Sequence, residues 1–378
     1  MGRTYRHRKK KTGEQRPVPL GNDVGYLGLV NWLADRKWSP SCKLVPVTFS
    51  DTGRGMMAKE NIPAGTILAS LPASALITAR TVADSPLAEL FLNTSACFST
   101  QQVLSSFLVL QKHLGEDSDW FAYINILPLQ YFSPVFATSD LIDAFPPTIV
   151  HKILRMQTKI DHLHSSLMGA VGQSRCPHCS KLYSELFTFD EFRWAWFTVN
   201  SRSVYLSPSV NKPCDIQLSD PNNIALAPYL DMINHSDLAK VNVLFDEANS
   251  TYSIVTLVPY KKHQEVFINY GSHSNEKLYL EYDFARWRSS RPHLGQLRRP
   301  VRSVHPVDHP VADEIPSTDE RSGKRRGQQS VGFPHQLRDR EGEIICFFQH
   351  NAGKHSCYII RCGSRLQQNA VTLRKTGP

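Results

Sequence analysis

Four polar features of the sequence carry groups that could bind or orient a ligand. Each one taken singly predicts local structure rather than chemistry. Glycines are common in turns, an Asn-His pair usually forms ordinary hydrogen bonds, and a tyrosine at a strand end usually packs. Only their combination suggests a functional site. In chain order they are Gly53-Arg-Gly55, Arg202, Asp231-Met-Ile-Asn-His235 and Tyr270-Gly271.

These features belong to six longer stretches whose types, order and separation resemble the SET-domain methyltransferases. The resemblance runs from about residue 28 to 285 and is nearest to the split-SET group, typified by Rubisco large-subunit lysine methyltransferase and actin-histidine methyltransferase. The stretches are Gly53-Arg-Gly-Met-Met-Ala58, Trp120-x-x-Tyr123-Ile-x-x-Leu127-Pro128, Trp194-Ala-Trp-x-x-Val-Asn-Ser-Arg202, Ala227-Pro-Tyr-Leu-Asp-Met-Ile-Asn-His-Ser236, Glu265-Val-Phe-Ile-Asn-Tyr-Gly271 and Leu280-Glu-Tyr-Asp-Phe284.

The resemblance implies S-adenosylmethionine as the methyl donor and Tyr270 as the catalytic residue, with its hydroxyl beside the transferring methyl group. No metal is implied at this site. Asp283 occupies a position where relatives usually carry glycine, and this departure is expected to loosen the last part of the site. The implied cofactor-binding residues are Thr52, Gly53, Arg54, Arg202, Asp231, Asn234, His235, Tyr270, Tyr282 and Phe284.

Methyl transfer to an amine is a direct displacement, so the enzyme has to align the reacting atoms in a dry channel. Aromatic walls such as Tyr270, Tyr282 and Phe284 suit this task and favour cations. A lysine nucleophile must be neutral, and with a pKa of about 10.4 only about 1 in 2,500 is neutral at pH 7. An apolar channel lowers that pKa. Tyr270 is expected to orient the amine rather than act as a general base, because a tyrosine pKa lies near 10.

The elements that position these residues follow a strand, helix, strand order. An amphipathic helix is predicted at 26–38, and strands at 43–49 and 66–71 flank the glycine turn. Helical periodicity dominates the segment from about residue 100 to 200. This segment is similar to the insertion that splits the SET domain in this group. Its clearest helix is 189–200, with Asp190 as the expected cap. Alternating strands at 241–246, 251–258 and 265–270 predict a β meander. The fold class is therefore α+β, a SET-type β-sheet fold split by a helical insertion.

Cysteine spacing offers a weak metal signal. The chain has eight cysteines and no signal peptide, so reduced thiols are expected. Cys176-Pro-His-Cys179 has the spacing of half a zinc site. The sequence holds no second CxxC, and neither Cys214 nor His178 has the spacing of a further ligand. A plain loop with two thiols is therefore expected, and no metal.

The two ends of the chain differ from its middle. Lys and Arg exceed Asp and Glu by 9, and the excess gathers at residues 3–11 and after residue 285. Residues 1–25 are predicted to be a basic, disordered leader, and residues 26–285 to be the SET domain. Residues 286–378 are predicted to be an atypical basic, disordered tail. The helical substrate domain that usually follows in this group is expected to be missing or replaced, as an alternative transcript or a faulty gene model would produce.

The sequence thus predicts a protein-lysine N-methyltransferase acting on histone or non-histone proteins in the nucleus and cytoplasm. Histidine is an alternative target, and a catalytically impaired SET-fold binding protein is a second interpretation. A nucleic-acid-binding protein with a CxxC finger is a third, although nucleic acid is not required. The sequence contains no apolar run of about 18 residues, so no membrane span is predicted.

Overall fold

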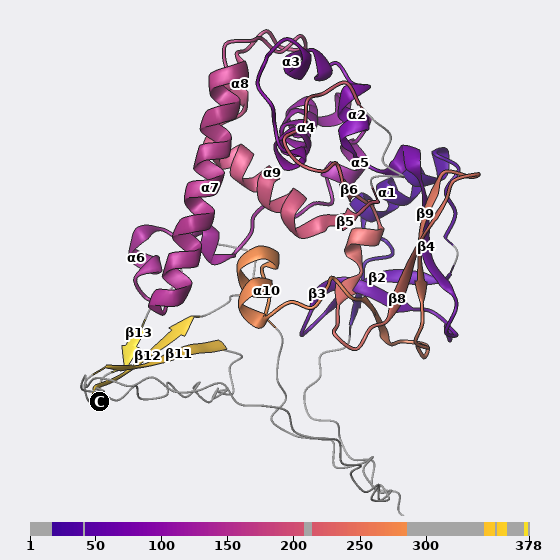
Figure 1. The fold of residues 1–378 in the computed structure, drawn as a ribbon. Coiled ribbons are helices and arrows are strands. Elements are labelled where there is room, and N and C mark those ends of the chain that lie inside the picture. The colour runs from indigo at the N-terminus through magenta and orange to yellow at the C-terminus, as the bar shows by residue number, and fades with distance from the viewer. Residues whose placement is uncertain are drawn as a thin grey trace, which may run out of the picture. The chain divides into compact units, whose positions relative to one another are not determined.

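The computed structural model describes residues 17–40, 42–207 and 214–285 with their side chains, and the backbone of three strands between 344 and 376 (Figure 1). The chain divides into two compact units. The larger contains the described residues up to 285 apart from Ala144–Pro146, and the smaller contains the three late strands. None of the helices among the described residues is long and apolar enough to cross a lipid bilayer.

A five-stranded sheet collects the segments that the motifs occupy. Its strand β10 lies between β3 and β7, antiparallel to β3 and parallel to β7, with Val266 opposite Met56 and Ile268 opposite His235. This pairing brings the glycine turn, the Asn234-His235 pair and the residues before Tyr270 to one sheet. In spatial order the strands are β1 (Val18–Pro19), β2 (Leu44–Phe49), β3 (Gly53–Ala58), β10 (Glu265–Ile268) and β7 (Asn234–His235).

The predicted β meander is wrong in its last strand. Two of its strands pair as a hairpin, but β10 leaves them and joins the other sheet. Alternating sequence predicts that a segment is a strand with one buried face, and it does not specify the partner strand. The second sheet has the order β4 (Ile67–Pro72), β9 (Thr251–Thr256) and β8 (Val241–Asp246), and a two-stranded sheet pairs β5 (Ser203–Tyr205) with β6 (Ile224–Leu226).

The helical insertion lies between the two sets of strands in the sequence, as predicted, and beside the sheets in space (Figure 1). Its two central helices, α4 and α9, pack against each other. Before it lies α1 (Val24–Asp35) and after it α10 (Asn275–Tyr282). Two short helices, α2 (Ala79–Ala83) and α3 (Ala88–Leu92), precede the predicted span. Within it lie α4 (Thr100–Leu114), α5 (Phe121–Ile124), α6 (Ser139–Ile142), α7 (Pro147–Val171), α8 (Tyr183–Leu186) and α9 (Phe189–Arg202).

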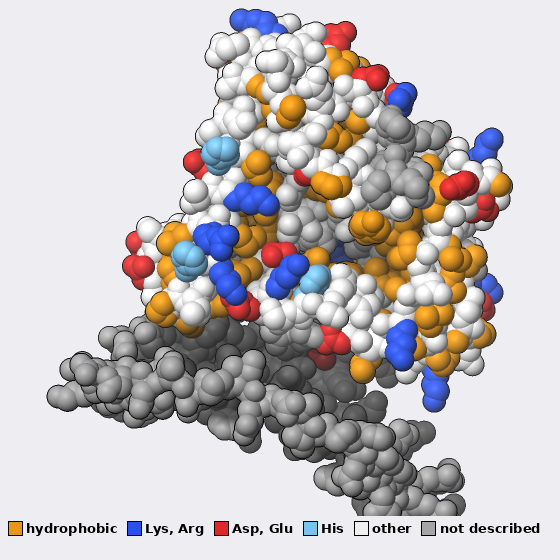
Figure 2. Space-filling view, viewed as in Figure 1, with side chains coloured by type: hydrophobic (Ala, Val, Ile, Leu, Met, Phe, Trp, Pro, Cys, Tyr) orange, Lys and Arg blue, Asp and Glu red, His pale blue; other side chains and the backbone are white. Residues whose placement is uncertain are grey.

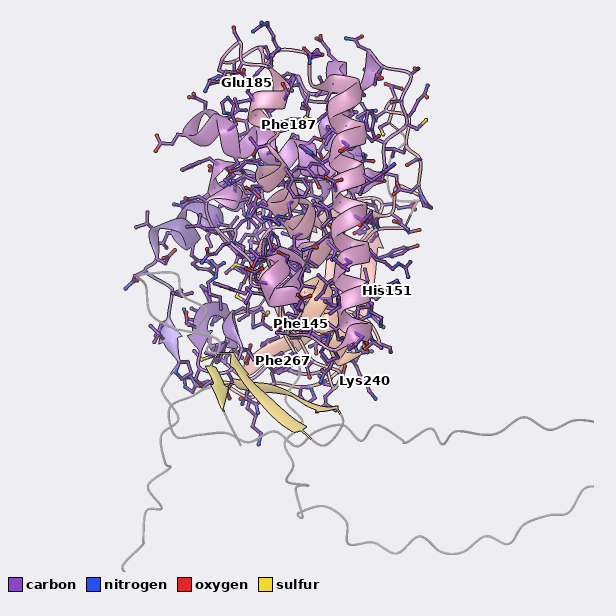
Figure 3. All side chains as sticks on the ribbon, turned by 90° about the vertical axis from the view of Figure 1, so that its left-hand side faces the viewer. Phe145, His151, Glu185, Phe187, Lys240 and Phe267 are labelled. Atoms are coloured by element: carbon purple, nitrogen blue, oxygen red, sulfur yellow. The ribbon has the colours of Figure 1, made fainter. Side chains whose placement is uncertain are left out.

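The long helix α7 is amphipathic. Ile153, Ile160 and Leu167 are fully buried and recur every two turns, which places them on one face. The opposite face is exposed and carries basic and histidine side chains, and Figure 2 shows such side chains gathered with apolar ones over this helix. Figure 3 shows His151 near the start of α7, whereas Phe187 lies toward its other end.

Helix α9 delivers Arg202 to the site. Its cap is Thr188 rather than the predicted Asp190, because the Thr188 hydroxyl accepts the backbone N–H of Glu191 at 3.3 Å. Phe192, Trp196 and Val199 are all buried and form the apolar face of this helix. A buried face fixes the rotation of the helix, and this directs its last residue toward the sheets.

The ends of the chain depart from the predicted boundaries where they are described. Residues 1–16 of the expected leader lie outside the described residues, while Val18–Pro19 already forms β1 against β2. Most of the expected tail, residues 286–343, also lies outside them. Beyond it the backbone forms an antiparallel sheet of β11 (Ile344–Asn351), β12 (Lys354–Ile360) and β13 (Arg374–Thr376).

Candidate active site

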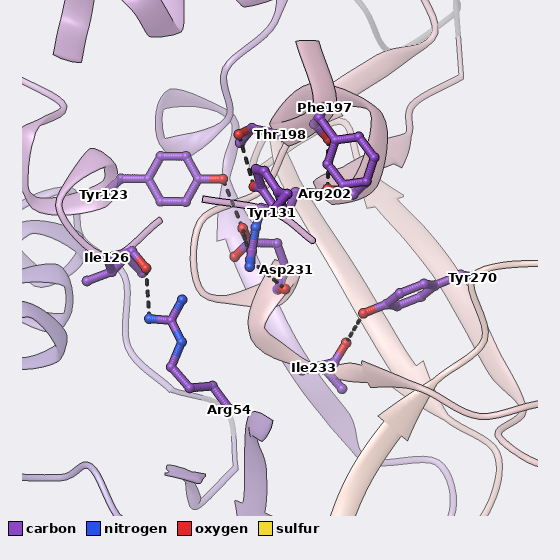
Figure 4. A network of polar contacts seen from close by, with 11 residues as sticks. Arg54, Tyr123, Ile126, Tyr131, Phe197, Thr198, Arg202, Asp231, Ile233 and Tyr270 are labelled. Atoms are coloured by element: carbon purple, nitrogen blue, oxygen red, sulfur yellow. Dashed lines mark hydrogen bonds and ion pairs between the residues drawn. The ribbon is translucent and has the colours of Figure 1, made fainter. Parts of the chain in front are cut away.

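Tyr270 is held in place at both its backbone and its hydroxyl. Its backbone N–H donates to Nδ1 of His235 at 3.0 Å, and its hydroxyl donates to the carbonyl oxygen of Ile233 at 2.8 Å (Figure 4). Burial raises the pKa of Tyr270 well above its usual value, and Arg202 opposes that shift only in part. The phenol therefore keeps its proton at neutral pH and acts as a hydrogen-bond donor.

An aromatic cluster surrounds this tyrosine. The ring centroid of Tyr270 lies 5.2 Å from that of His235, 5.5 Å from that of Tyr282 and 6.4 Å from that of Phe284. The hydroxyl of Tyr282 lies 3.3 Å from Nε2 of His273. The end of α10 and the residues just after it thus place two aromatic rings beside Tyr270.

A cavity of about 190 Å³ opens beside Tyr270. Its walls are mainly aromatic and aliphatic, and Arg202 and Asp231 add polar groups. A ligand that fills such a cavity displaces water, which strengthens the polar contacts made inside it. The aromatic side chains that line it are Tyr205, Tyr252, Tyr270 and Tyr282.

A buried ion pair borders the cavity. Nη1 of Arg202 lies 3.1 Å from Oδ2 of Asp231, which also accepts the hydroxyl of Tyr123 at 2.9 Å (Figure 4). The Asp231 side chain is only 1% exposed. Burial raises the pKa of Asp231, and the adjacent guanidinium opposes this rise. Among the described residues, Oδ1 of Asp231 and Nε of Arg202 have no hydrogen-bond partner, so each remains available to a polar ligand.

The glycine turn is tied to the Asn-His pair by a third group of contacts. Nδ2 of Asn234 donates to the carbonyl oxygen of Arg54 at 3.0 Å and to Oε1 of Glu265 at 2.8 Å. The hydroxyl of Thr52 donates to the same carboxylate at 2.8 Å. Burial raises the pKa of Glu265, and its amide and hydroxyl partners oppose the shift.

Two glycines make this turn possible. Gly53 has φ +71°, a conformation that other residues rarely adopt. A Cβ on Gly55 would lie 2.6 Å from Nδ2 of Asn234 and 2.7 Å from Oε1 of Glu265, so a larger residue there would displace these two side chains. The chain therefore forms a tight turn here, and its Arg54 lies close enough to Arg202 and Asp231 to interact with both electrostatically.

All ten residues predicted for the site lie in the aromatic cluster, in the buried ion pair or in the glycine turn and its contacts, and none lies elsewhere in the fold. Their roles toward a cofactor stay predictions. Sequence reasoning missed Tyr123, Glu265 and the carbonyl of Ile233. The first two belong to stretches that carried the resemblance, so their place in those stretches was the available signal, whereas a backbone carbonyl leaves none.

Asp283, where relatives usually carry glycine, adopts a left-handed conformation with φ +67° at the end of α10. That position favours glycine because a side chain is strained there. In the structure Oδ2 of this aspartate accepts the backbone N–H of Phe132 at 2.8 Å, a contact that glycine could not make. Burial raises the pKa of Asp283 to about 6, and this hydrogen bond opposes the shift.

We expect Asp283→Asn to stabilise the protein at neutral pH and not in acid. The carboxyl pKa is about 3.9 in the unfolded chain and higher in the folded one, so rising pH removes the proton from the unfolded state first. Folding stability is therefore lost between about pH 4 and pH 6. Asparagine tolerates this backbone and keeps the acceptor oxygen.

The gain over wild type should be at most about 3 kcal/mol above pH 6 and should fade toward pH 4. Urea unfolding of both chains at pH 4 and pH 7.5 measures it, with Asp161→Asn at an exposed carboxylate of α7 as the matched control. A gain that does not change with pH would contradict a raised pKa of Asp283 in the folded protein.

Comparison with known proteins adds to this geometry. Residues 53–271 match the family model described as the SET domain. SET domain-containing protein 4 of Mus musculus is 36% identical over 294 residues, which cover 77% of this chain and 65% of that protein. Its Homo sapiens counterpart is 32% identical, with 86% and 71% covered. Actin-histidine N-methyltransferase of Danio rerio is 25% identical, with 73% and 45% covered.

Solved structures show the same fold. The SET domain of LSMT bound to lysine and AdoHcy superposes with a TM-score of 0.57 at 18% identity, covering 69% of this chain and 57% of that one. Rubisco LSMT bound to AdoMet gives a TM-score of 0.53 at 20% identity, covering 69% and 56%. The chain thus spans about two thirds or less of the length of most of these proteins.

Proposed function

Since the chain belongs to the SET-domain family, we propose that it is an S-adenosylmethionine-dependent methyltransferase that modifies lysine side chains of proteins. The observation that carries this proposal is the Tyr270 hydroxyl, which is fixed on the Ile233 carbonyl beside an aromatic-lined cavity. Direct methyl transfer requires no covalent nucleophile from the enzyme, and none of the residues assigned a role here is one.

The residues present fit the donor. S-adenosylmethionine, when bound, supplies an activated methyl group. The turn at Gly53 and Gly55 offers backbone groups in a cradle that a side chain would fill. The unpaired atoms of Asp231 and Arg202 offer one acceptor and one donor inside the protein. Asn234 fixes the turn through the carbonyl oxygen of Arg54.

The chain also provides what the accepting amine needs. An apolar cavity lowers the pKa of a lysine that enters it, because burial disfavours the charged form. The aromatic rings of Tyr205, Tyr252 and Tyr282 line this cavity. Tyr270 retains its proton, so it orients the reacting group and does not remove a proton from it.

A protein substrate agrees with the surface around this cavity. Tyr205 and Val243 line it and are 64% and 51% exposed, so a polypeptide could pack on them while one side chain enters. We further propose histones among the substrates, and action in the nucleus and cytoplasm, on the ground of the basic cluster at residues 3–11.

Histidine is the second candidate target, because the similarity extends to actin-histidine N-methyltransferases. The test is to incubate the full chain with methyl-labelled S-adenosylmethionine and a mixture of histones and cell proteins, and to map modified sites by mass spectrometry. Label on lysine supports the proposal. Label on histidine alone supports the second candidate. No label despite measurable donor binding would indicate a SET-fold binding protein. A reaction without added chain is the control.

A further inference from the structure

Three metal-ligating side chains meet within the helical insertion. His113 lies in the last turn of α4, while Cys176 and Cys179 lie in the loop between α7 and α8. One ligand atom of each lies within 4.8 Å of the other two, and Nε2 of His113 is 3.2 Å from Sγ of Cys179. Figure 3 marks this end of the insertion with Glu185, which belongs to α8.

The loop that carries the two cysteines is a tightly closed turn. A β-bridge between Arg175 and Leu182 closes it, and the backbone N–H of Cys176 donates to the carbonyl oxygen of Lys181 at 2.9 Å. Inside the turn, the N–H of Ser180 donates to the carbonyl oxygen of Cys176 at 2.8 Å, and Ser180 takes a left-handed φ of +63°. These contacts hold both sulfur atoms toward α4.

The burial of the three ligands suits a structural ion rather than a surface contact. The Cys176 side chain is buried, with 1% exposure, and the other two are partly buried. Two thiolates and an imidazole are the ligand types that Zn²⁺ prefers, and a CxxC pair with a distant histidine is a usual arrangement. The fourth position of a tetrahedral site can be filled by water or by His178, whose ring centroid lies 6.1 Å from that of His113.

We propose that the chain binds one Zn²⁺ ion through Nε2 of His113 and the sulfur atoms of Cys176 and Cys179. Binding releases the two thiol protons to solvent, so the site carries no net charge from its two thiolates and the ion. The ion links the end of α4 to the loop between α7 and α8. None of the three ligands lines the cavity at Tyr270, so the role of the ion is to stabilise the insertion.

The test measures metal in the full chain, purified with a phosphine reductant and without chelator. Elemental mass spectrometry should find about one zinc per chain. Cys176→Ser, Cys179→Ser and His113→Ala should each weaken zinc affinity by more than the 10- to 100-fold that loss of an outer partner typically costs. Cys97→Ser, at an exposed cysteine outside the cluster, is the matched control and should keep its zinc.

A second measurement covers the case in which a cysteine variant fails to fold. Wild-type chain reconstituted with Co²⁺ should show thiolate-to-metal charge-transfer absorption and the visible bands of a tetrahedral ion. Zinc should displace the cobalt. Three results would overturn the proposal: wild type that holds no zinc after growth and refolding with it, a Cys176–Cys179 disulfide persisting under reductant, or zinc retained in full by His113→Ala.

Discussion

Replacing Tyr270 with phenylalanine is expected to slow methyl transfer by roughly 100- to 1,000-fold while leaving donor binding nearly unchanged. The substitution keeps the ring, which packs against His235, Tyr282 and Phe284. It removes only the hydroxyl that is fixed at 2.8 Å from the Ile233 carbonyl oxygen beside the cavity. An interaction that orients the reacting group acts mainly in the transition state, so its loss lowers the rate more than the affinity.

Single-turnover measurements with labelled donor give the rate, and calorimetry gives the donor affinity. Tyr260→Phe is the matched control, because Tyr260 also donates its hydroxyl to a backbone carbonyl, that of Phe267 at 2.8 Å, outside the cavity. The control should lose a similar small amount of stability and keep its rate. A Tyr270→Phe chain as fast as wild type would remove Tyr270 from the proposed mechanism.

The largest loss of stability is expected from Arg202→Met. The methionine keeps an unbranched apolar stem but leaves the carboxylate of Asp231, 1% exposed, without the guanidinium 3.1 Å away. Removing one partner of a buried ion pair typically costs about 3–5 kcal/mol, because the remaining charge stays buried. Burial already raises the pKa of Asp231, and losing Arg202 raises it further. The loss should therefore shrink as the pH falls and Asp231 takes up a proton.

Denaturant unfolding at pH 5 and pH 8 measures both the loss and its pH dependence. The matched control is Arg80→Met, which breaks an exposed Arg80–Asp84 pair of 2.7 Å and should leave stability nearly unchanged. The double variant Arg202→Met, Asp231→Met should recover part of the loss, since no lone charge remains buried. Equal stability of Arg202→Met and wild type would contradict a structural role for the pair.

The sequence by itself determined the family and most of the local structure. The predicted resemblance to SET domains is confirmed by the family model over residues 53–271. Periodicity located α4, α9 and the strands, because hydrophobic spacing reports which face of an element is buried. The polar residues of the six stretches then indicated the site. In the structure Asn234-His235 forms β7 and Tyr270 comes shortly after β10, and both strands belong to one sheet.

Only the tertiary structure decided which elements meet. Strand β10 leaves its hairpin neighbours to pair with β3 and β7, and this pairing is what joins the glycine turn to Tyr270. Arg202 meets Asp231 from a different element, and His113 reaches Cys179 across 66 positions of sequence. The physical reason is common to all three. A local pattern encodes how much of a segment is buried, whereas the partner that buries it is chosen by packing of the whole chain.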